Sequence, residues 1–355
     1  MKVLALTKRR PQNRDLFTRP YGRFYHLPRL LATSGNEVHL VFASYQAEPE
    51  LTEVRDGMTL HSLRAAPNVG AFYASLLQIA SDIKPDVVIA FSDTWYGILG
   101  ARIANAVDCK LVIDAYDNYE AYISWAKPLH WLWRKALRRA DGITAAGPQL
   151  LEMLCRYGKD TSSAIVPMAA DPLFEPLPLI QSREALGLPT DRKLIGYLGT
   201  ADRTRGFDLF INAIEQLELK RLDYGVVLSG RNHAELTLPE HRLHRMGYVE
   251  DANMPLLINS CDLLVCINKD SAFGNFSYPV KIYEALACER PVLASDTAPA
   301  RWILCDTNSL LTPLGDAHKM ASKMSYLLDN PVTLRESRST WEASSLILQK
   351  LLADI

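Results

Sequence analysis

The stretch that decides the fold runs Ser277-Tyr-Pro-Val-Lys-Ile-Tyr-Glu-Ala-Leu-Ala-Cys-Glu-Arg-Pro-Val-Leu-Ala-Ser295. Its first part predicts a helix that Ser277 caps and that holds Pro279 in its first turn. The part after Arg290 is a short apolar run, typical of a parallel strand covered on both faces. A helix followed directly by a buried strand is the repeating unit of an open α/β sheet.

Short apolar runs of this kind recur along the chain, with amphipathic stretches between them. Buried strands are predicted at 3–6, 38–41, 87–90, 111–113 and 142–145, and again at 194–198, 225–228, 263–267, 292–294 and 310–311. The alternation predicts right-handed β-α-β units and therefore doubly wound parallel sheets. The Pro- and Leu-rich stretch 167–189 interrupts the pattern and is the best linker candidate.

The sequence thus predicts two Rossmann-like doubly wound domains facing each other across a cleft. The expected boundaries are 1–170 for an N-terminal domain and 171–335 for a C-terminal domain. Residues 336–355 are expected to form a terminal helix that crosses back to the first domain. A ligand is expected where the carboxyl ends of the strands lie.

Composition narrows the class of protein. The 355 residues carry 39 basic and 40 acidic side chains, and this balance argues against a general nucleic-acid binder. No apolar run reaches the roughly 18–20 residues of a membrane span. The six cysteines lack metal-ligand spacing, which favours a reduced cytoplasmic compartment over a disulfide framework or zinc site.

Lys281 and Glu284 are the first candidate binding residues. They stand three positions apart and so share one face of the predicted helix, near its N-terminus. A cation at a helix N-terminus favours a phosphate, while a carboxylate one turn later can accept hydrogen bonds from vicinal sugar hydroxyls. A plain surface salt bridge between the two is the competing interpretation.

The same stretch resembles the nucleotide-binding motif of retaining GT-B glycosyltransferases, in the family 4 variant S-P-x-K-x-x-E-(Y)-x-A-x-G-x-P-V. The resemblance implies that Glu284 holds the ribose hydroxyls of the donor. Tyr278 and Glu289 depart from the variant, which has Ser and Gly there. Phe276 stands where the commoner E-x7-E motif has its first glutamate, the residue that contacts the donor sugar in the family.

Residues 197–208 resemble the family loop G-R-x(4–5)-K-G, whose two cations hold the donor pyrophosphate. Arg205 matches the second cation. Thr200 occupies the first cation position, so Arg203 or Lys281 would supply the missing charge. For Arg203 and Arg205 the competing interpretation is a solvated loop. The resemblance implies these donor-binding residues: Gly199, Thr200, Arg203, Gly206, Tyr248, Val249, Ser277 and Pro279.

Other family segments follow in the expected order. The segment 245–249 resembles the family segment whose backbone contacts the base, and 261–266 resembles one of the family's buried strands. The segment 166–171 resembles the family's interdomain turn, and 139–144 resembles the family segment that leads into a strand. Trp341 fits the terminal helix that crosses back.

The N-terminal domain is expected to hold the acceptor. The segment 19–26 stands where the family has a glycine-rich loop, and Gly22 would let the backbone approach a ligand. A plain turn is equally compatible. Polar residues after two predicted strands complete the acceptor-side set, which is Arg19, Gly22, Arg23, Asp93, Asp114 and Glu120. One of Asp114, Asp117 and Glu120 is expected to be a helix N-cap. Asp117 is a candidate for assisting proton transfer.

Tyr122–Arg139 interleaves three tryptophans with basic residues. One interpretation is an interfacial helix that makes a peripheral contact with anionic lipid. The other is a helix that packs its aromatic face on the core and solvates its cations.

The predicted function is transfer of a sugar from a nucleoside-diphosphate sugar to a glycan or lipid-linked hydroxyl, with retention, as in polysaccharide or glycolipid biosynthesis. The predicted catalytic group is Arg205, Lys281, Glu284 and Asp117. No cofactor and no metal are predicted, since the cations carry the pyrophosphate charge. In the family the departing phosphate accepts the acceptor's proton. The predicted location is cytoplasmic, with a peripheral contact at the inner membrane face as an open option. Alternatives are a non-catalytic nucleotide- or partner-binding subunit and another GT-B enzyme, such as a nucleotide-sugar epimerase.

Overall fold

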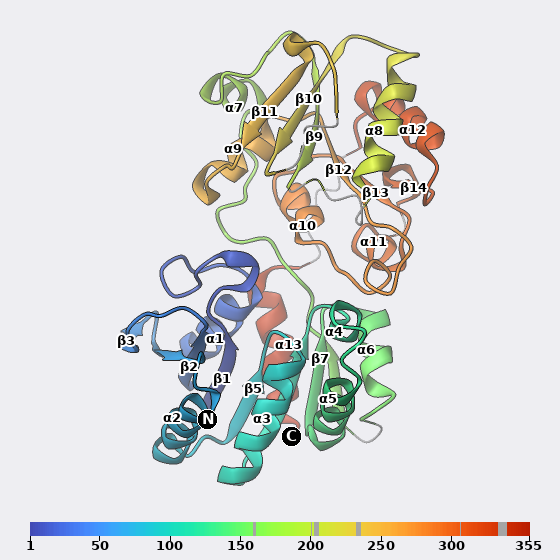
Figure 1. The fold of residues 1–355 in the computed structure, drawn as a ribbon. Coiled ribbons are helices and arrows are strands. Elements are labelled where there is room, and N and C mark those ends of the chain that lie inside the picture. Colours follow the sequence, from blue (N-terminus) through green and yellow to red (C-terminus); the bar gives the residue numbers. More distant parts are fainter. Residues whose placement is uncertain (159–160, 200, 202–205, 232–235, 306, 333–338) are drawn as a thin grey trace. The chain divides into compact units, whose positions relative to one another are not determined.

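The computed structural model describes residues 1–158, 161–199, 201, 206–231, 236–305, 307–332 and 339–355 (Figure 1). The chain forms two compact units. Unit 1 contains residues 1–169 and 339–355, and unit 2 contains residues 170–338. The prediction of two doubly wound α/β domains is confirmed by the sheet of each unit.

Unit 1 is built on an eight-stranded sheet in the order β3-β4-β2-β1-β5-β6-β7-β8. All neighbouring strands are parallel except β3 and β4, which form an antiparallel hairpin at one edge. The strands are β1 Lys2–Lys8, β2 Glu37–Ser44, β3 Leu51–Arg55, β4 Met58–Arg64, β5 Val87–Ala90, β6 Lys110–Ala115, β7 Gly142–Ala145 and β8 Ser162–Ile165.

The helices of unit 1 connect and cover these strands. They are α1 Arg23–Thr33, α2 Val69–Ile83, α3 Thr94–Val107, α4 Tyr119–Tyr122, α5 Lys127–Arg139, α6 Pro148–Cys155 and α13 Trp341–Ala353. Helix α13 comes from the far end of the chain and packs on α1 and β8. Its Trp341 stacks on His26 of α1, with ring centroids 5.8 Å apart.

Unit 2 is built on a six-stranded, all-parallel sheet in the order β11-β10-β9-β12-β13-β14. The strands are β9 Lys193–Leu198, β10 Tyr224–Ser229, β11 Leu243–Gly247, β12 Leu263–Cys266, β13 Val292–Ser295 and β14 Leu311–Thr312. The helices are α7 Leu179–Ala185, α8 Phe207–Glu218, α9 Met254–Asn259, α10 Val280–Ala287, α11 Ala298–Ile303 and α12 Ala317–Asp329.

Each sheet has a point where the chain reverses its direction of travel across the strands. In unit 1 this switch point lies between β1 and β5, and in unit 2 between β9 and β12. The loops that leave the carboxyl ends of such a strand pair run in opposite directions and leave a crevice between them. These two places are therefore where each unit is expected to hold a ligand.

Two details differ from the sequence-based expectation. Pro279 is itself the N-cap of α10, and Ser277 makes no capping hydrogen bond there, because it lies two residues ahead of the cap and out of the first turn. The stretch 122–139 is not one helix but α4 and α5 with a break between them. Pro128, in the first turn of α5, cannot continue a preceding helix because it lacks an N–H.

Within the described part of the chain, every helix is too short or too polar to cross a bilayer.

Candidate functional site

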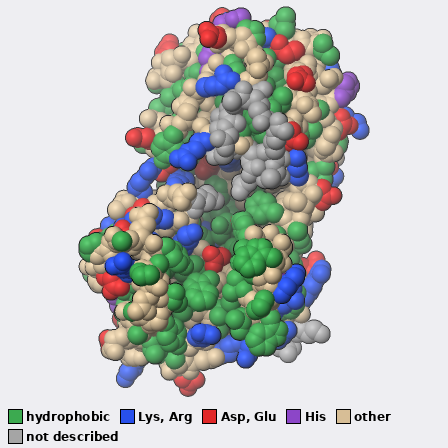
Figure 2. Space-filling model, in the orientation of Figure 1, with side chains coloured by type: hydrophobic (Ala, Val, Ile, Leu, Met, Phe, Trp, Pro, Cys, Tyr) green, Lys and Arg blue, Asp and Glu red, His purple; other side chains and the backbone are tan. Residues whose placement is uncertain are grey.

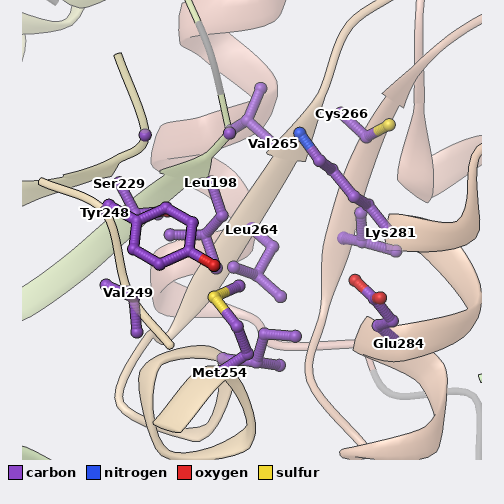
Figure 3. A pocket seen from close by; sticks show the side chains of 15 residues that line it. Leu198, Ser229, Tyr248, Val249, Met254, Leu264, Val265, Cys266, Lys281 and Glu284 are labelled. Atoms are coloured by element: carbon purple, nitrogen blue, oxygen red, sulfur yellow. The ribbon is translucent and has the colours of Figure 1, made fainter. Parts of the chain in front are cut away.

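A pocket of about 220 Å³ opens at the switch point of unit 2, beside the carboxyl ends of β9 and β12 (Figure 3). It is lined by residues of β9, β10, β12, β13, α9 and α10 and by residues that directly follow β9, β10 and β11: Gly196, Leu198, Gly199, Ser229, Gly230, Tyr248, Val249, Met254, Ile258, Leu264, Val265, Cys266, Lys281, Glu284 and Val292. Most of the described lining is apolar, and its charged members among these described residues, Lys281 and Glu284, both belong to α10.

The pocket has two unlike walls (Figure 3). Tyr248, Val249 and Met254 form one side, where the flat aromatic ring and the thioether offer an apolar surface. Lys281 and Glu284 extend from α10 on the other side. The first wall suits a planar base, and the second suits the sugar and phosphate groups of a nucleotide.

Gly199 and Lys281 are in close contact. Gly199 follows β9 directly with a φ of +126°, and a Cβ built there would lie 2.0 Å from the Lys281 Nζ. The ammonium group therefore occupies the space that any side chain at position 199 would fill. This contact fixes a positive charge at the carboxyl end of β9, near the first turn of α10, where a phosphate is favoured.

Glu284 lies one helical turn after Lys281 and points into the same pocket (Figure 3). Its side chain is partly exposed, so its carboxylate is accessible from the pocket. A carboxylate accepts hydrogen bonds only, and two oxygens at one end match a pair of neighbouring hydroxyls. The spacing of three residues thus brings a cation and a hydrogen-bond acceptor into the same pocket.

The remaining donor-side candidates divide into four groups. Tyr248 and Val249 line the pocket, whereas Ser277 and Pro279 precede α10 and are absent from its lining. Gly206 is the N-cap of α8 with a φ of +106°, and a Cβ there would lie 2.6 Å from the Ile267 Cγ2, so the position requires glycine. Thr200, Arg203 and Arg205 lie outside the described residues.

Sequence reasoning did not single out several lining residues, among them Ser229, Gly230 and Cys266. All three stand at the carboxyl ends of β10 and β12. The signal that finds them is the strand order, since the residues that follow strands at a switch point face the crevice.

Arg23 and Asp114 were expected to face an acceptor, and the structure corrects this. Both side chains are buried and bind each other through two 2.6 Å hydrogen bonds. Arg23 also donates to the carbonyl of Val166, and Asp114 accepts from the Thr144 hydroxyl. The pair joins α1 to β6 and to the end of β8, so its two charges compensate each other inside unit 1 instead of facing a ligand.

Two further acceptor-side candidates are engaged within unit 1. Both carboxylate oxygens of Glu120 accept hydrogen bonds from Arg134, at 2.9 and 2.6 Å. Asp117 is buried and accepts a 2.7 Å hydrogen bond from the Tyr122 hydroxyl. The catalytic role of Asp117 stays a prediction, and its visible role is to hold α4.

Asp93 lies at the switch point of unit 1, directly after β5. It is the N-cap of α3 and accepts from the backbone N–H of Trp95 at 3.0 Å. The capping role expected of Asp114, Asp117 or Glu120 is not borne out, because the N-cap of α4, the helix that follows β6, is Asn118. Burial raises the pKa of Asp93. The preceding Ser92 has a φ of +87°, a conformation that L-residues rarely adopt outside functional sites and tight turns.

Gly22 and Arg19 belong to the connection between β1 and α1. Gly22 is the N-cap of α1 with a φ of +64°, and no atom of the described residues lies within 4 Å of a Cβ built there. Arg19 is exposed. The open space beside Gly22 is compatible with the predicted approach of a ligand to the backbone.

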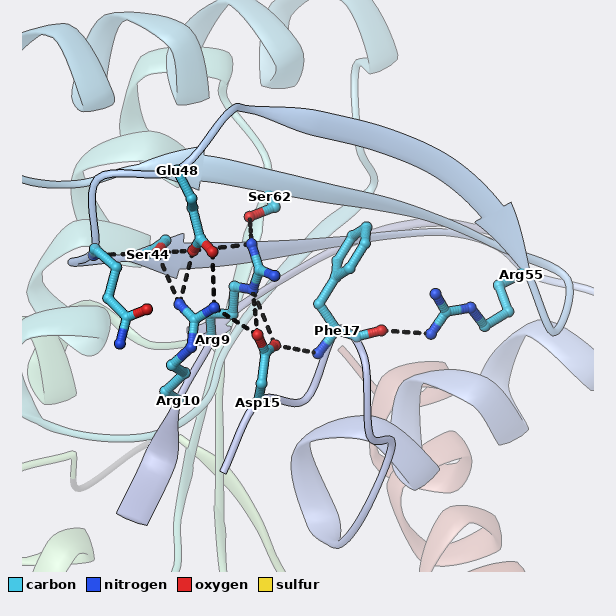
Figure 4. Close-up of polar contacts among 9 residues, drawn as sticks. Arg9, Arg10, Asp15, Phe17, Ser44, Glu48, Arg55 and Ser62 are labelled. Carbon is cyan, nitrogen blue, oxygen red and sulfur yellow. Dashed lines mark hydrogen bonds and ion pairs between the residues drawn. The ribbon is translucent and has the colours of Figure 1, made fainter. Parts of the chain in front are cut away.

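A polar network that the sequence did not reveal holds this connection in place (Figure 4). Asp15 and Glu48 each bind both Arg9 and Arg10, at distances of 2.5 to 2.9 Å. Hydrogen bonding from Arg10 is the main cause that lowers the pKa of Glu48 to about 2. The network ties the residues after β1 to the end of β2, at the carboxyl edge of the unit 1 sheet.

The comparisons with known proteins agree with this architecture. The model described as "Glycosyl transferase 4-like domain" matches residues 23–167, and that described as "Glycosyl transferases group 1" matches residues 192–330. The chain is 30% identical over 166 residues to a phosphatidyl-myo-inositol mannosyltransferase of Mycobacterium leprae, covering 44% of this chain and 43% of the relative.

A second curated relative is the lipopolysaccharide core biosynthesis mannosyltransferase LpsB of Rhizobium meliloti. It is 26% identical over 190 residues, which cover 49% of this chain and 51% of the relative. The chain thus matches about half the length of these curated relatives.

Solved structures match over nearly the whole chain. The sucrose-phosphate synthase of Thermosynechococcus elongatus superposes with a TM-score of 0.77 at 16% identity, covering 99% of this chain and 98% of that one. Anabaena HepE in complex with UDP gives 0.73 at 16% identity, with complete coverage of both chains. Since glycosyltransferase domain models match both of its units in order, the chain belongs to the family-4-like glycosyltransferases with the GT-B fold.

Proposed function

We propose that this protein transfers a sugar from a nucleoside-diphosphate sugar to a hydroxyl of a glycan or lipid-linked acceptor, with retention and without a metal. The observation that carries the proposal is the pocket of unit 2, where Lys281 and Glu284 share one ligand volume at the switch point. Family membership supports the reaction class.

The proposed roles follow from the geometry of the pocket. Glu284 accepts hydrogen bonds from the ribose hydroxyls, and Tyr248 with Val249 covers the base. Lys281 and the first turn of α10 face the diphosphate and stabilise the charge that develops as the glycosidic bond breaks. A fixed ammonium performs the electrostatic task that a divalent ion performs elsewhere, which is the reason for proposing metal independence. Arg205 stays the predicted second cation, and Arg203 stays the alternative to Lys281 for the first.

The acceptor class is proposed from the relatives. The names of the two curated mannosyltransferases refer to a phosphatidylinositol lipid and to a lipopolysaccharide core, and HepE was also solved with UDP-glucose. We extend a hexose donor and a lipid-linked or glycan acceptor to this chain. Asp93 is the acceptor-side candidate retained at the switch point of unit 1. Work on the cytoplasmic side is part of the same proposal.

The test is calorimetric titration of UDP, GDP, ADP and dTDP into the wild-type protein and Glu284→Gln, with EDTA present. One nucleotide is expected to bind the wild type. The variant should bind it roughly 10–100-fold more weakly, as when a hydrogen bond to a charged group worth about 1.5–3 kcal/mol is lost. Glu289→Gln, at an exposed carboxylate five residues further on, is the matched control and should bind like the wild type.

Turnover is measured next with the corresponding nucleotide sugar and candidate acceptors, and the anomeric configuration of the product is read by NMR. A product with inverted configuration would refute retention. Nucleotide binding without any transfer would favour the non-catalytic subunit, for which the replacement of the family glutamate by Phe276 is the specific argument. An isomerised nucleotide sugar would favour an epimerase.

A further inference from the structure

The segment that contains α4 and α5 exposes three large aromatic side chains. Tyr122 is 52% exposed, Trp125 81% and Trp131 60%. Tyrosine and tryptophan are largely buried in most folded proteins, since each contributes a large apolar area when it is removed from water. Three of them exposed within ten residues form a surface that invites a partner.

The opposite face of α5 already packs on the core, so rotating the helix would not bury these exposed aromatic side chains without exposing others. Trp133 is buried and fits against Gly97 of α3, where a Cβ would lie 2.2 Å from its ring. Its ring also meets Tyr119 edge-on at 5.9 Å. His130 is buried beside it. This packing fixes the rotation of α5 and therefore holds Trp131 outward.

Cations surround the exposed aromatics. Lys127, Lys135 and Arg138 stand on the exposed side of α5, with Trp131 between the first two. The Lys135 Nζ lies 5.7 Å from the Trp131 ring centroid. No acidic residue occurs from 121 to 140, and Glu120, which precedes this stretch, is already bound to Arg134. The positive charge of this face is thus not compensated within its own segment.

Figure 2 shows the same combination on the surface, where hydrophobic side chains gather with Lys and Arg beside them over the region of α4 and α5. We define the aromatic–cationic surface as Tyr122, Trp125, Lys127, Trp131, Lys135 and Arg138.

We infer that the aromatic–cationic surface docks on an anionic lipid bilayer. Indole and phenol rings favour the boundary between headgroups and acyl chains, because they join an apolar body to a polar tip. Lysine and arginine beside them are attracted to anionic headgroups. Helix α5 has 13 residues, five of which are Lys or Arg, so it would lie in the interface and not span the bilayer.

The aromatic–cationic surface lies near the edge of the unit 1 sheet where the acceptor is expected. Helix α4 begins four residues after β6 ends, so the surface starts beside the carboxyl edge of the unit 1 sheet. A membrane held there would present headgroup hydroxyls to the edge where an acceptor is expected. This last point rests on the proposed function, whereas docking itself does not.

The experiment is co-sedimentation of the full chain with vesicles of phosphatidylglycerol and phosphatidylcholine, and with vesicles of phosphatidylcholine alone. Binding to the anionic vesicles is expected, with a blue shift of tryptophan emission and a decline as salt is added. Binding to the neutral vesicles should be much weaker. Equal binding to both, or none to the anionic ones, would overturn the inference.

Two sets of variants assign binding to this surface. Lys127→Gln/Lys135→Gln/Arg138→Gln should lower the partition coefficient on the order of a hundredfold, at roughly fivefold per charge near an anionic surface. Its matched control, Lys84→Gln/Lys319→Gln/Lys350→Gln, removes three exposed cations elsewhere and should bind within a few-fold of the wild type. Equal losses in the two triples would mean attraction by total charge and would refute a local surface.

Trp125→Ser/Trp131→Ser should abolish the blue shift and most of the binding. The control Leu219→Ser/Tyr326→Ser removes two exposed apolar side chains in unit 2 and should leave both unchanged. Circular dichroism and thermal midpoints verify that each variant folds. Nucleotide titration of the same samples separates the proposals, because a wild type that binds nucleotide but no vesicle refutes docking alone, and the converse refutes the donor site alone.

The wild type could fail to bind vesicles while Trp125→Ser/Trp131→Ser changes the oligomeric state of the protein. In that case the surface joins copies of this chain and the inference fails.

Discussion

At the scale of single residues, the contact between Gly199 and Lys281 makes a sharp prediction. Gly199→Ala would place a Cβ where the Lys281 ammonium now lies and would push this charge away from the carboxyl end of β9. We expect nucleoside diphosphate to bind roughly 10–100-fold more weakly, the loss of one charge-assisted contact. The nucleoside without phosphates should bind as it does to the wild type.

Gly187→Ala is the matched control for backbone strain. Gly187 also has a positive φ, +64°, but within the described part of the chain no atom lies within 4 Å of its Cβ position. Both variants therefore force an L-residue into a strained conformation, and only one displaces a cation. Calorimetry on both compares the two effects. Equal weakening by the two, or equal loss of nucleoside and diphosphate from Gly199→Ala, would contradict the assignment of Lys281 to the phosphates.

Local spacing and distant pairing differ in what a sequence reveals. Helical periodicity brings Lys281 and Glu284 together because they are three residues apart, and the structure places both in one pocket. Arg23 and Asp114 are 91 residues apart, and nothing in their neighbourhoods indicates that each is the other's partner. A polar residue after a strand is therefore an ambiguous signal, since it can face a ligand or a buried countercharge.

At the scale of elements, the parallel pair β2 and β4 carries a pH-sensitive contact. His39 and His61 stack with ring centroids 5.4 Å apart, and their nearest ring nitrogens are separated by 3.1 Å. Thr52 contacts the other nitrogen of His61, and Glu37 the other nitrogen of His39. Burial, followed by the charge of His39, lowers the pKa of His61 to about 4.

This depressed pKa predicts how stability depends on pH. Between pH 4 and about 6.5 the unfolded chain binds a proton at His61 that the folded chain excludes, so the free energy of unfolding falls as the pH is lowered through this window. The loss should amount to roughly 1–3 kcal/mol. His61→Gln should flatten this slope, as measured by urea unfolding at a series of pH values. His318→Gln, at an exposed histidine of α12, should leave the slope as it is.

Some strands could be predicted from the sequence more easily than others. Fully buried runs such as β1 and β5 were predicted within a few residues, because an apolar run has few other places in a soluble fold. The edge hairpin of β3 and β4 was missed, since β3 is largely exposed. Its Asp56-Gly57 turn, with both residues at positive φ, was nevertheless a readable hairpin signal.

At the scale of the whole molecule, the two units have separate cores, and unit 1 is completed by α13. Trp341→Ala would remove a large buried ring that stacks on His26 and should destabilise unit 1 by about 3–5 kcal/mol. Hydrogen exchange measured by mass spectrometry should accelerate in peptides of β7 in unit 1. It should stay unchanged in peptides of β10 in unit 2.

Leu346→Ala, at an exposed position of the same helix, is the control and should accelerate neither. Acceleration in both units with Trp341→Ala would show that they unfold together and would contradict the separation into two cores.

The order of the chain also has a consequence for biosynthesis. Unit 2 is one continuous segment, but unit 1 takes its last helix from residues made after all of unit 2. While the ribosome is still adding unit 2, the surface of α1 and β8 on which α13 packs stays exposed, and Gly142 lacks its contact with Leu351. Unit 1 therefore cannot reach its native core in the usual N-terminal-first order, and the nascent chain exposes an apolar surface until α13 emerges.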